Sequence, residues 1–249
     1  MIRLLAKFAW ILLGWLEWAL LTALLYPLSF LPARPHPRPW YVHLFRLWSQ
    51  AWVHALGVDL RLHQRNRRPL PEHYILIANH PSAFEDIGIP ALFPVRSLAK
   101  IEVRDWWIVG RISAAAGTLY VDRESPESRK AAVDLLVDTL QAGDNLALYP
   151  EGGVKGKHLH DNFRYGAFEV SLRTGIPILP VYLHYEAGDD FFWGPQNLIG
   201  KILDIMQTRN NRANYYVYDA FQPADYADAV EYAKAAHARF LEWEERHQG

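Results

Sequence analysis

The sequence begins with a long apolar stretch, and this stretch restricts how the chain can fold. It reads FAWILLGWLEWALLTALLY from Phe8 to Tyr26, and Glu17 is its one charged side chain. Nine of these residues are Leu, Ile or Phe, and each favours membrane insertion by roughly 0.3–0.6 kcal/mol. Their sum, roughly 3–5 kcal/mol, matches or exceeds the roughly 2.5–3.5 kcal/mol cost of one charge at mid-membrane. The stretch therefore favours a spanning, shallow or re-entrant membrane helix, with a buried helix of a soluble core as the alternative.

A second helix is predicted after the first. The run PLSFLPARPHPRP cannot continue a helix, because each proline removes an amide donor. From Trp40 to Leu56 a helical period resumes, with Trp48 and Trp52 on the apolar face and a mildly basic stripe opposite. This arrangement suits the headgroup boundary of a bilayer, although a helix on a soluble core would show the same period. We expect residues 1–57 to form an N-terminal pair of membrane-anchoring helices.

Beyond residue 57, short apolar runs alternate with helix-length segments. The runs that resemble strands are VDLRLH, YILIA, TLYVD, NLALYP, PILPVYL and NYYVYDA. Helices are expected near 83–94, 104–116, 126–141 and 165–174, with a closing amphipathic helix near the C-terminus. This order predicts an α/β domain over residues 58–249 with a mixed, mainly parallel sheet flanked by helices. Pro180 predicts an interruption in the middle of PILPVYL.

The composition excludes several classes of function. The 249 residues carry 26 basic and 27 acidic side chains, so the net charge of −1 predicts no nucleic-acid partner. There is no cysteine, which excludes disulfides, thiolate metal sites and a thiol nucleophile. His158, His160 and Asp161 are a candidate metal site, but two histidines in a loop are more often solvent-exposed, and no metal is expected.

The segment NHPSAFED, from Asn79 to Asp86, is the first candidate site. Ser82 and Glu85 fit a capping box of the form S-x-x-E. In such a box the serine side chain accepts the backbone N–H of the glutamate, and the glutamate side chain accepts the backbone N–H of the serine. The cap leaves His80 unexplained at the carboxyl end of a strand, where open α/β sheets place their ligands. One helical turn returns Glu85 or Asp86 to the ring, where a carboxylate accepts Nδ1–H and raises the basicity of Nε2. His80 is therefore predicted to remove a proton from a hydroxyl substrate.

Two further strand ends carry side chains suited to an anion. In YPEGG, Glu151 precedes Gly152 and Gly153, which permit a tight turn close to a ligand, and Lys155 follows. In GTLYVDRES, Arg123 offers a planar fork of donors that suits phosphate. A plain glycine turn and a surface ion pair are the alternative interpretations.

Four segments together resemble a known family. NHPSAFED, GTLYVDR, YPEGG and GIPILPV, in this order and at these separations, resemble the four blocks of the glycerolipid acyltransferases, typified by the 1-acylglycerol-3-phosphate acyltransferases. The resemblance covers roughly residues 60–185 and implies a glycerol-3-phosphate acyltransferase-like fold. It also implies that His80 is the catalytic base and that Glu85 orients it, with Asp86 as the competitor for that role. The third block departs from the family, which usually continues Glu-Gly-Thr-Arg, whereas this chain has Gly153 and Val154 in the last two places.

The resemblance further implies a reaction. A fatty acyl group would pass from acyl-CoA or acyl carrier protein to the hydroxyl of a lysolipid, in the first place 1-acylglycerol-3-phosphate, without a bound cofactor or metal. Substrate binding is assigned to Asn79, Ser82, Arg123, Glu151, Gly152, Gly153 and Lys155. The enzyme would serve phospholipid synthesis at the inner face of the cytoplasmic membrane, in contact with membrane lipid. The alternatives are acylation of another lysolipid, such as lyso-ornithine lipid, and a non-catalytic lipid-binding protein of the same fold.

Overall fold

The computed structural model describes residues 2–32, 36–122, 124–154, 156–192 and 198–248. It divides into two compact units. Unit 1 contains Met1–Asp59 and Asp86–Ala132, and unit 2 contains Leu60–Glu85 and Val133–Gly249. The division predicted at residue 57, between membrane anchor and acyltransferase domain, stays a prediction.

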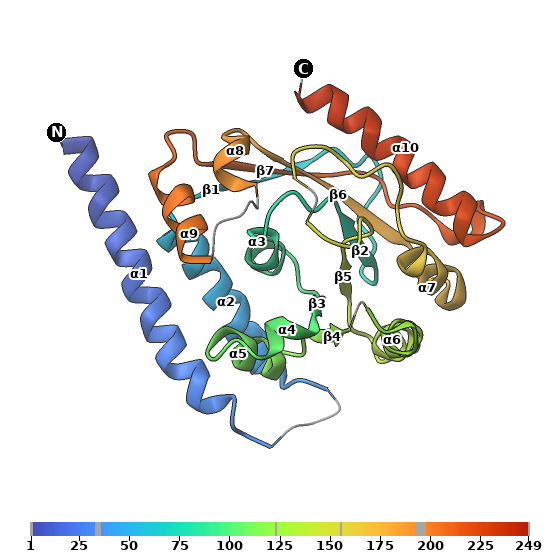
Figure 1. The fold of residues 1–249 in the computed structure, drawn as a ribbon, viewed down its shortest axis with the longest axis horizontal. Coiled ribbons are helices and arrows are strands. Elements are labelled where there is room, and N and C mark those ends of the chain that lie inside the picture. The colour runs from blue at the N-terminus through green and yellow to red at the C-terminus, as the bar shows by residue number, and fades with distance from the viewer. Residues whose placement is uncertain (1, 33–35, 123, 155, 193–197, 249) are drawn as a thin grey trace. The chain divides into compact units, whose positions relative to one another are not determined.

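Unit 1 is mainly helical. Its elements are α1 (Ile2–Leu28), α2 (Pro39–Ala55), most of α3 (Glu85–Leu92), β3 (Arg96–Lys100), α4 (Ile101–Arg104), α5 (Val109–Ala115), β4 (Leu119–Val121) and the start of α6 (Pro126–Gln141). The strands β3 and β4 are parallel, with Leu98 opposite Leu119. The long helices α1 and α2 lie side by side, drawn in blue in Figure 1. The two helices predicted for the first 57 residues are therefore present.

Close packing between α1 and α2 depends on a glycine and on two hydrogen bonds. A Cβ added at Gly14 of α1 would lie 2.6 Å from the backbone nitrogen of Ala55 in α2, so the two backbones approach as closely as glycine allows. The indole N–H of Trp48 donates to Thr22 Oγ1 at 2.7 Å. The hydroxyl of Tyr41 donates to the carbonyl of Leu25 at 3.1 Å.

Replacing Gly14 by alanine should loosen this pair. The new methyl group meets backbone, which cannot turn aside, so an overpacking cost of about 1–3 kcal/mol outweighs the gain of about 1 kcal/mol in helix propensity. Thermal unfolding in detergent should show a lower Tm for Gly14→Ala. Gly166→Ala in α7 is the matched control, because its Cβ would meet nothing within 4 Å. A Tm for Gly14→Ala at or above that of the wild type would contradict the close packing.

The single charge of the apolar stretch has a partner. Glu17 Oε2 lies 2.9 Å from His54 Nδ1 of α2, and the ring of Trp10 lies 4.2 Å from that imidazole between centroids. Residues Phe8–Leu28 have a mean hydropathy of 1.8, and only 11% of the most apolar window is buried, so the apolar surface of α1 faces outward. By length and composition this helix can cross a membrane, and the pairing with His54 offsets part of the cost of Glu17.

Unit 2 contains the larger part of the strands. Its elements are β1 (Asp59–Gln64), β2 (Ile75–Ala78), β5 (Leu146–Leu148), α7 (Gly166–Thr174), β6 (Ile178–Tyr185), α8 (Gly188–Phe191), α9 (Leu198–Gln207), β7 (Arg212–Val217), the 3₁₀ turn η1 (Pro223–Asp225) and α10 (Ala229–Gln248). The strands run in the order β1-β7-β6-β2-β5, with β2 parallel to β5 and β6, and β7 antiparallel to β6. The expected fold class, a mixed and mainly parallel sheet flanked by helices, is confirmed.

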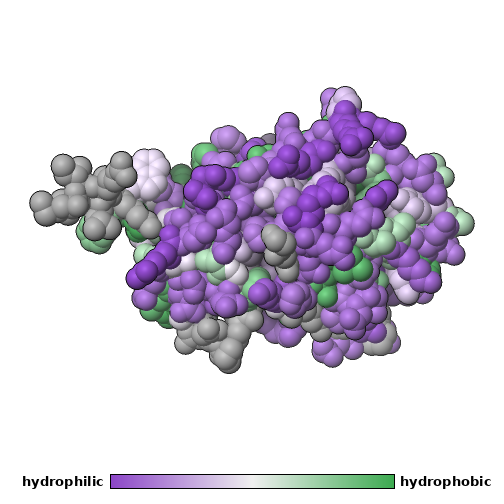
Figure 2. Space-filling model, turned by 90° about the horizontal axis from the view of Figure 1, so that it is seen from above, coloured by the Kyte–Doolittle hydropathy of each residue, from purple (hydrophilic) through white to green (hydrophobic). Residues whose placement is uncertain are grey.

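The core of unit 2 lies between its sheet and two helices. Every residue of β2 is 0% exposed. The helices α7 and α10 pack against each other, α10 contacts β6 and α7 contacts β2 (Figure 1). Phe168, Tyr232 and Phe240 of these helices are also 0% exposed. The outer side of α10 is polar, and the face seen from above in Figure 2, on which α10 lies, is largely hydrophilic.

The interruption predicted at Pro180 is wrong, because β6 runs without a break from Ile178 to Tyr185. The carbonyl of Pro180 accepts the N–H of Tyr218, just beyond the last β6–β7 pair, Val181 with Val217. In a strand the N–H and C=O of one residue point to the same side. The missing amide of Pro180 therefore faces the end of the β7 ladder, and pairing with β2 continues.

Candidate active site

His80 is fixed in place by the strand that precedes it. The buried strand β2 lies between two parallel neighbours and ends at Ala78, so residue 80 comes at the carboxyl edge of the sheet. The backbone N–H of His80 donates to Glu151 Oε1 at 2.6 Å. Glu151 follows β5, so two predicted site residues that are far apart in the sequence meet at adjacent strand ends.

Glu151 holds two segments of backbone with its two oxygens. Besides the N–H of His80, its Oε2 accepts the N–H of His160 at 2.9 Å. The side chain is 3% exposed. Burial raises the pKa of Glu151 above its ordinary value of 4.5, although the two N–H donors offset part of this rise. The carboxylate thus anchors the backbone of the histidine, and its predicted contact with substrate stays a prediction.

The imidazole of His80 lies between an aromatic ring and a carboxylate. The ring of Tyr149 is stacked on it, with centroids 4.1 Å apart and an interplanar angle of 11°. On the ring edge, Nδ1 lies 3.9 Å from Glu85 Oε2. This distance exceeds a hydrogen bond, but catalytic contacts in an enzyme without substrate are often long and shorten in the complex. With 6% of His80 exposed, the ring is packed in one orientation.

Glu85 serves the cap and the histidine with different oxygens. Its Oε1 accepts the N–H of Ser82 at 2.8 Å, which is one half of the predicted capping box. Ser82 Oγ accepts the N–H of Phe84 at 3.1 Å, two residues on and not three. Its Oε2 faces His80. Ser82 Oγ also donates to the carbonyl of Phe191 at 2.6 Å, so both roles of this hydroxyl are structural. Glu85 is 0% exposed.

These contacts favour Glu85 as the acid that orients His80. The carboxyl group of Asp86, its competitor, belongs to an exposed residue. Asn79 forms a two-way hydrogen bond with the backbone of Leu183: its amide donates to the carbonyl at 2.9 Å, and its oxygen accepts the N–H at 2.7 Å. This pair ties the end of β2 to β6. The substrate contacts of Asn79 and Ser82 and the catalytic role of Asp86 stay predictions.

The glycine turn after Glu151 is present, and an arginine lies beside it. Gly152 has φ +78°, a conformation that favours glycine. A Cβ there would lie 3.3 Å from Nε of Arg164. The backbone N–H of Arg164 donates to the carbonyl of Pro150 at 2.7 Å, which brings this cation to the turn. Gly153 is half-buried next to it.

Two of the predicted binding residues, Arg123 and Lys155, lie outside the described residues. Tyr149 and Arg164 lie at the site although the sequence motifs did not mark them as site residues. Tyr149 is the first residue of YPEGG, at the end of the predicted strand NLALYP. This position is the feature of the sequence that could have indicated a site residue. No local pattern marks Arg164, because only the fold returns it to the turn. Among the described side chains, no group of three or more His, Cys, Asp or Glu could hold a metal.

A cavity lies beside the site in unit 2. Its volume is about 270 Å³, and Asn79, Pro81, Lys157, Leu183 and Glu186 are among the residues that line it. Asn79 and Pro81 flank His80 in the chain, so the cavity borders the segment that carries the imidazole. Concave sites of this kind, with convergent polar groups, are where substrates bind most often.

Comparison with known proteins gives one family. A model of the family described as Acyltransferase matches residues 59–184. A 1-acyl-sn-glycerol-3-phosphate acyltransferase of Neisseria gonorrhoeae is 29% identical over 47% of this chain and 48% of its own length. A lyso-ornithine lipid O-acyltransferase of Pseudomonas aeruginosa is 31% identical over 57% of this chain and 54% of its own length. The chain spans about half the length of the curated relatives it matches.

A solved structure has the same fold along nearly the whole chain. The crystal structure of the 1-acyl-sn-glycerophosphate (LPA) acyltransferase PlsC from Thermotoga maritima aligns with a TM-score of 0.65, covering 99% of this chain and 98% of that one. The identity is 16%, so the likeness concerns the fold. The family model spans half of the chain and includes the His80 and Glu151 segments. The chain therefore belongs to the acyltransferase family, as the four sequence blocks predicted.

Proposed function

We propose that this chain is an O-acyltransferase that moves a fatty acyl group from an acyl-thioester to the hydroxyl of a lysolipid. The observation that carries the proposal is the setting of His80. Its ring is stacked on Tyr149, its Nδ1 faces the buried Glu85 at 3.9 Å, and its backbone is held by Glu151. Membership of the acyltransferase family supports the same reaction class.

The proposed reaction is a direct transfer. With a proton on Nδ1 directed at Glu85, Nε2 of His80 is the basic nitrogen and accepts the proton of the acceptor hydroxyl. The hydroxyl oxygen forms a bond to the thioester carbonyl carbon, and the carbonyl electron pair moves onto oxygen. When the tetrahedral intermediate collapses, the C–S bond breaks and the thiolate takes the proton from the imidazolium. The products are the acylated lipid and a free thiol, and His80 is neutral again.

A covalent acyl-enzyme is disfavoured by the available nucleophiles. The chain has no cysteine. The nearest serine in sequence, Ser82, donates its hydroxyl proton to the carbonyl of Phe191 and lies at 0% exposure. A nucleophilic serine instead needs its proton directed at a base. Neither group supports a two-step mechanism, which leaves the lysolipid hydroxyl as the attacking group.

We assign the acceptor to 1-acylglycerol-3-phosphate, with lyso-ornithine lipid as the alternative. Similar proteins are named for each of these activities. The arginine that the family usually carries after the glycine turn is replaced by Val154, but Arg164 lies against Gly152 and supplies a cation at the same turn. A guanidinium there suits a phosphate group. Arg123 and Lys155 are proposed to assist it.

We place the protein at the inner face of the cytoplasmic membrane. The apolar surface of α1 faces outward along a segment long enough to cross a bilayer, and a lysolipid is a membrane-borne substrate. The acyl donor is proposed to be acyl-CoA or acyl carrier protein, with no bound cofactor.

A substrate panel tests the proposal. Purified protein is given one acyl-thioester with lysophosphatidic acid, lyso-ornithine lipid or lysophosphatidylcholine, and thiol release is followed. We expect release to depend on a lysolipid and to be fastest with lysophosphatidic acid.

In Arg164→Ala, KM for lysophosphatidic acid should rise about 10-fold, because the variant loses one charge-assisted contact of about 1.5 kcal/mol, while kcat changes little. Arg173→Ala in α7, an exposed arginine paired with Asp134, is the control. Thiol release that does not depend on a lysolipid would refute the transfer reaction. Faster release with lyso-ornithine lipid than with lysophosphatidic acid would make lyso-ornithine lipid the acceptor.

A further inference from the structure

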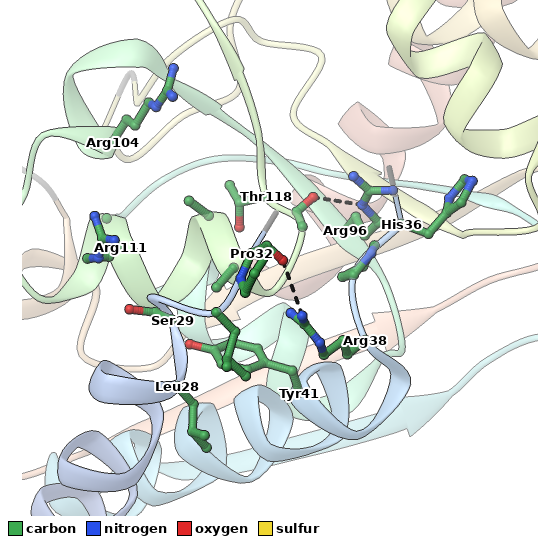
Figure 3. Close-up of a pocket in the computed structure, with 16 residues that line it drawn as sticks. Leu28, Ser29, Pro32, His36, Arg38, Tyr41, Arg96, Arg104, Arg111 and Thr118 are labelled. Carbon is green, nitrogen blue, oxygen red and sulfur yellow. Dashed lines mark hydrogen bonds between the residues drawn. The ribbon is translucent and has the colours of Figure 1, made fainter. Parts of the chain in front are cut away.

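Unit 1 contains a strongly basic cavity that none of the site residues above enters. Its volume is about 330 Å³, and it lies where α1 ends and the chain turns toward α2. Four arginines line it, Arg38, Arg96, Arg104 and Arg111, and Figure 3 shows them around the space above Tyr41. The described lining includes no aspartate or glutamate. Four guanidinium groups with no carboxylate in the lining create a positive potential inside a concave site.

Two of the arginines donate to backbone carbonyls, and a third lies over an aromatic ring. Arg96 Nε donates to the carbonyl of Gly117 at 2.7 Å, and Arg38 Nη2 donates to the carbonyl of Pro32 at 3.2 Å. The guanidinium carbon of Arg111 lies 3.5 Å from the centroid of the Phe30 ring. A carbonyl or an aromatic face orients a guanidinium without cancelling its charge. Phosphate oxygens, which guanidinium groups bind in a bidentate manner, are the ligand that this arrangement suits.

The cavity lies at the C-terminal end of the apolar helix α1. Leu28 and Leu31, at the end of the apolar helix, form part of its wall. Large aromatic rings near this end are exposed: Phe30 is 57% exposed and Trp107 is 78% exposed. The ring centroids of Tyr26 and Trp107 lie 6.3 Å apart, so the tryptophan lies beside the last turn of α1. Exposed tryptophan and tyrosine at the end of an apolar helix mark the membrane–water boundary.

We propose that this cavity binds the phosphate of an anionic phospholipid headgroup, at a site separate from the acyl-transfer site. The lipid chains would run beside the exposed face of α1, and the arginines would hold the phosphate at its end. The inference rests on the proposed membrane contact of α1, and not on acyl transfer. The chemistry recognised is a phosphate ester, which a bilayer lipid or a soluble molecule such as CoA could supply. The exposed aromatic rings near the end of α1 favour the lipid.

The test is sedimentation of the full chain with vesicles, in the absence of acyl donor and lysolipid. Arg104→Gln/Arg111→Gln is compared with Arg173→Gln/Arg239→Gln, which removes the same charge from α7 and α10. With phosphatidylcholine vesicles that contain phosphatidylglycerol, the first double variant should bind about 30-fold more weakly than the wild type, because each arginine near such a surface contributes about fivefold. The second should lose little, and pure phosphatidylcholine should show no difference. Arg104→Lys/Arg111→Lys should recover part of the binding, which separates charge from misfolding.

Other outcomes would overturn the proposal. If Arg104→Gln/Arg111→Gln binds the anionic vesicles as tightly as the wild type, or if the control pair loses as much, the cavity does not bind the lipid. If the variant loses binding of free CoA or inorganic phosphate, measured by calorimetry, while vesicle binding is intact, the phosphate comes from a soluble molecule. Because no acyl transfer occurs in the assay, these failures leave the proposed reaction untouched.

Discussion

Replacing His80 by alanine should reduce thiol release in the presence of lysolipid by about 10²–10⁴-fold, the usual contribution of a general base. The loss should fall on kcat, because the imidazole acts on the proton during bond formation and adds little to substrate affinity. The fold should survive, since the substitution removes a side chain at the end of β2 and leaves the backbone of the strand unchanged. The backbone N–H that Glu151 binds is present in the variant as well.

The measurement is kcat and KM for wild type and His80→Ala, together with Tm. His73→Ala is the matched control: this half-buried histidine lies before β2, at the opposite end of the strand from His80, and its Nε2 contacts the carbonyl of Asp144 at 3.1 Å. We expect its kcat to stay within about twofold of the wild type, as for a residue outside the reaction. A kcat for His80→Ala near that of the wild type would remove the base from the mechanism.

Local patterns in the sequence were sufficient for much of this site. Ser82 and Glu85 are three residues apart, and this spacing alone predicts a capping box, one half of which the structure contains. The apolar run YILIA predicts a buried strand, and His80 comes two residues after its end, which places the histidine near the carboxyl end of that strand. The spacing left Glu85 and Asp86 as alternatives, because it could not show that the two oxygens of a buried Glu85 face different partners, Ser82 N–H and the ring of His80. That Glu85 orients His80 stays a prediction.

Contacts between distant segments were not readable from the sequence. Arg164 reaches Gly152 through a backbone hydrogen bond to Pro150, and no spacing rule relates these positions. The strand β3, Arg96–Lys100, was not predicted, because its residues are only half-buried and two of its five side chains are basic. The helix predicted near 104–116 is shorter in the structure: α5 spans Val109–Ala115, and the separate helix α4 ends at Arg104. Gly110 packs against the backbone of Arg104, and its absent side chain allows this sharp change of direction.

Replacing Glu151 by glutamine should impair both the fold and the reaction. Each carboxylate oxygen accepts one backbone N–H, from His80 and from His160. The amide of glutamine has one acceptor, so its NH₂ group would face the other N–H donor. A buried donor left without an acceptor costs about 1–3 kcal/mol. Because the displaced backbone carries the imidazole proposed as the base, kcat should also fall, by roughly 10²-fold for a shift of about 1 Å. Glu169→Gln, at an exposed position of α7, is the control.

The pH dependence of stability tests the same carboxyl group independently of activity. Burial raises the pKa of Glu151 in the folded chain above its ordinary value of 4.5. The folded state therefore holds this proton more tightly than the unfolded state. The resulting stabilisation is complete below about pH 4.5 and is lost as the pH rises through the raised pKa. Glutamine does not titrate. In a series of unfolding curves, the advantage of the wild type over Glu151→Gln should therefore shrink as the pH rises above 4.5 and then become constant. An advantage that grows with pH over this range would mean that ionisation of Glu151 favours folding, with the two N–H groups dominating over burial.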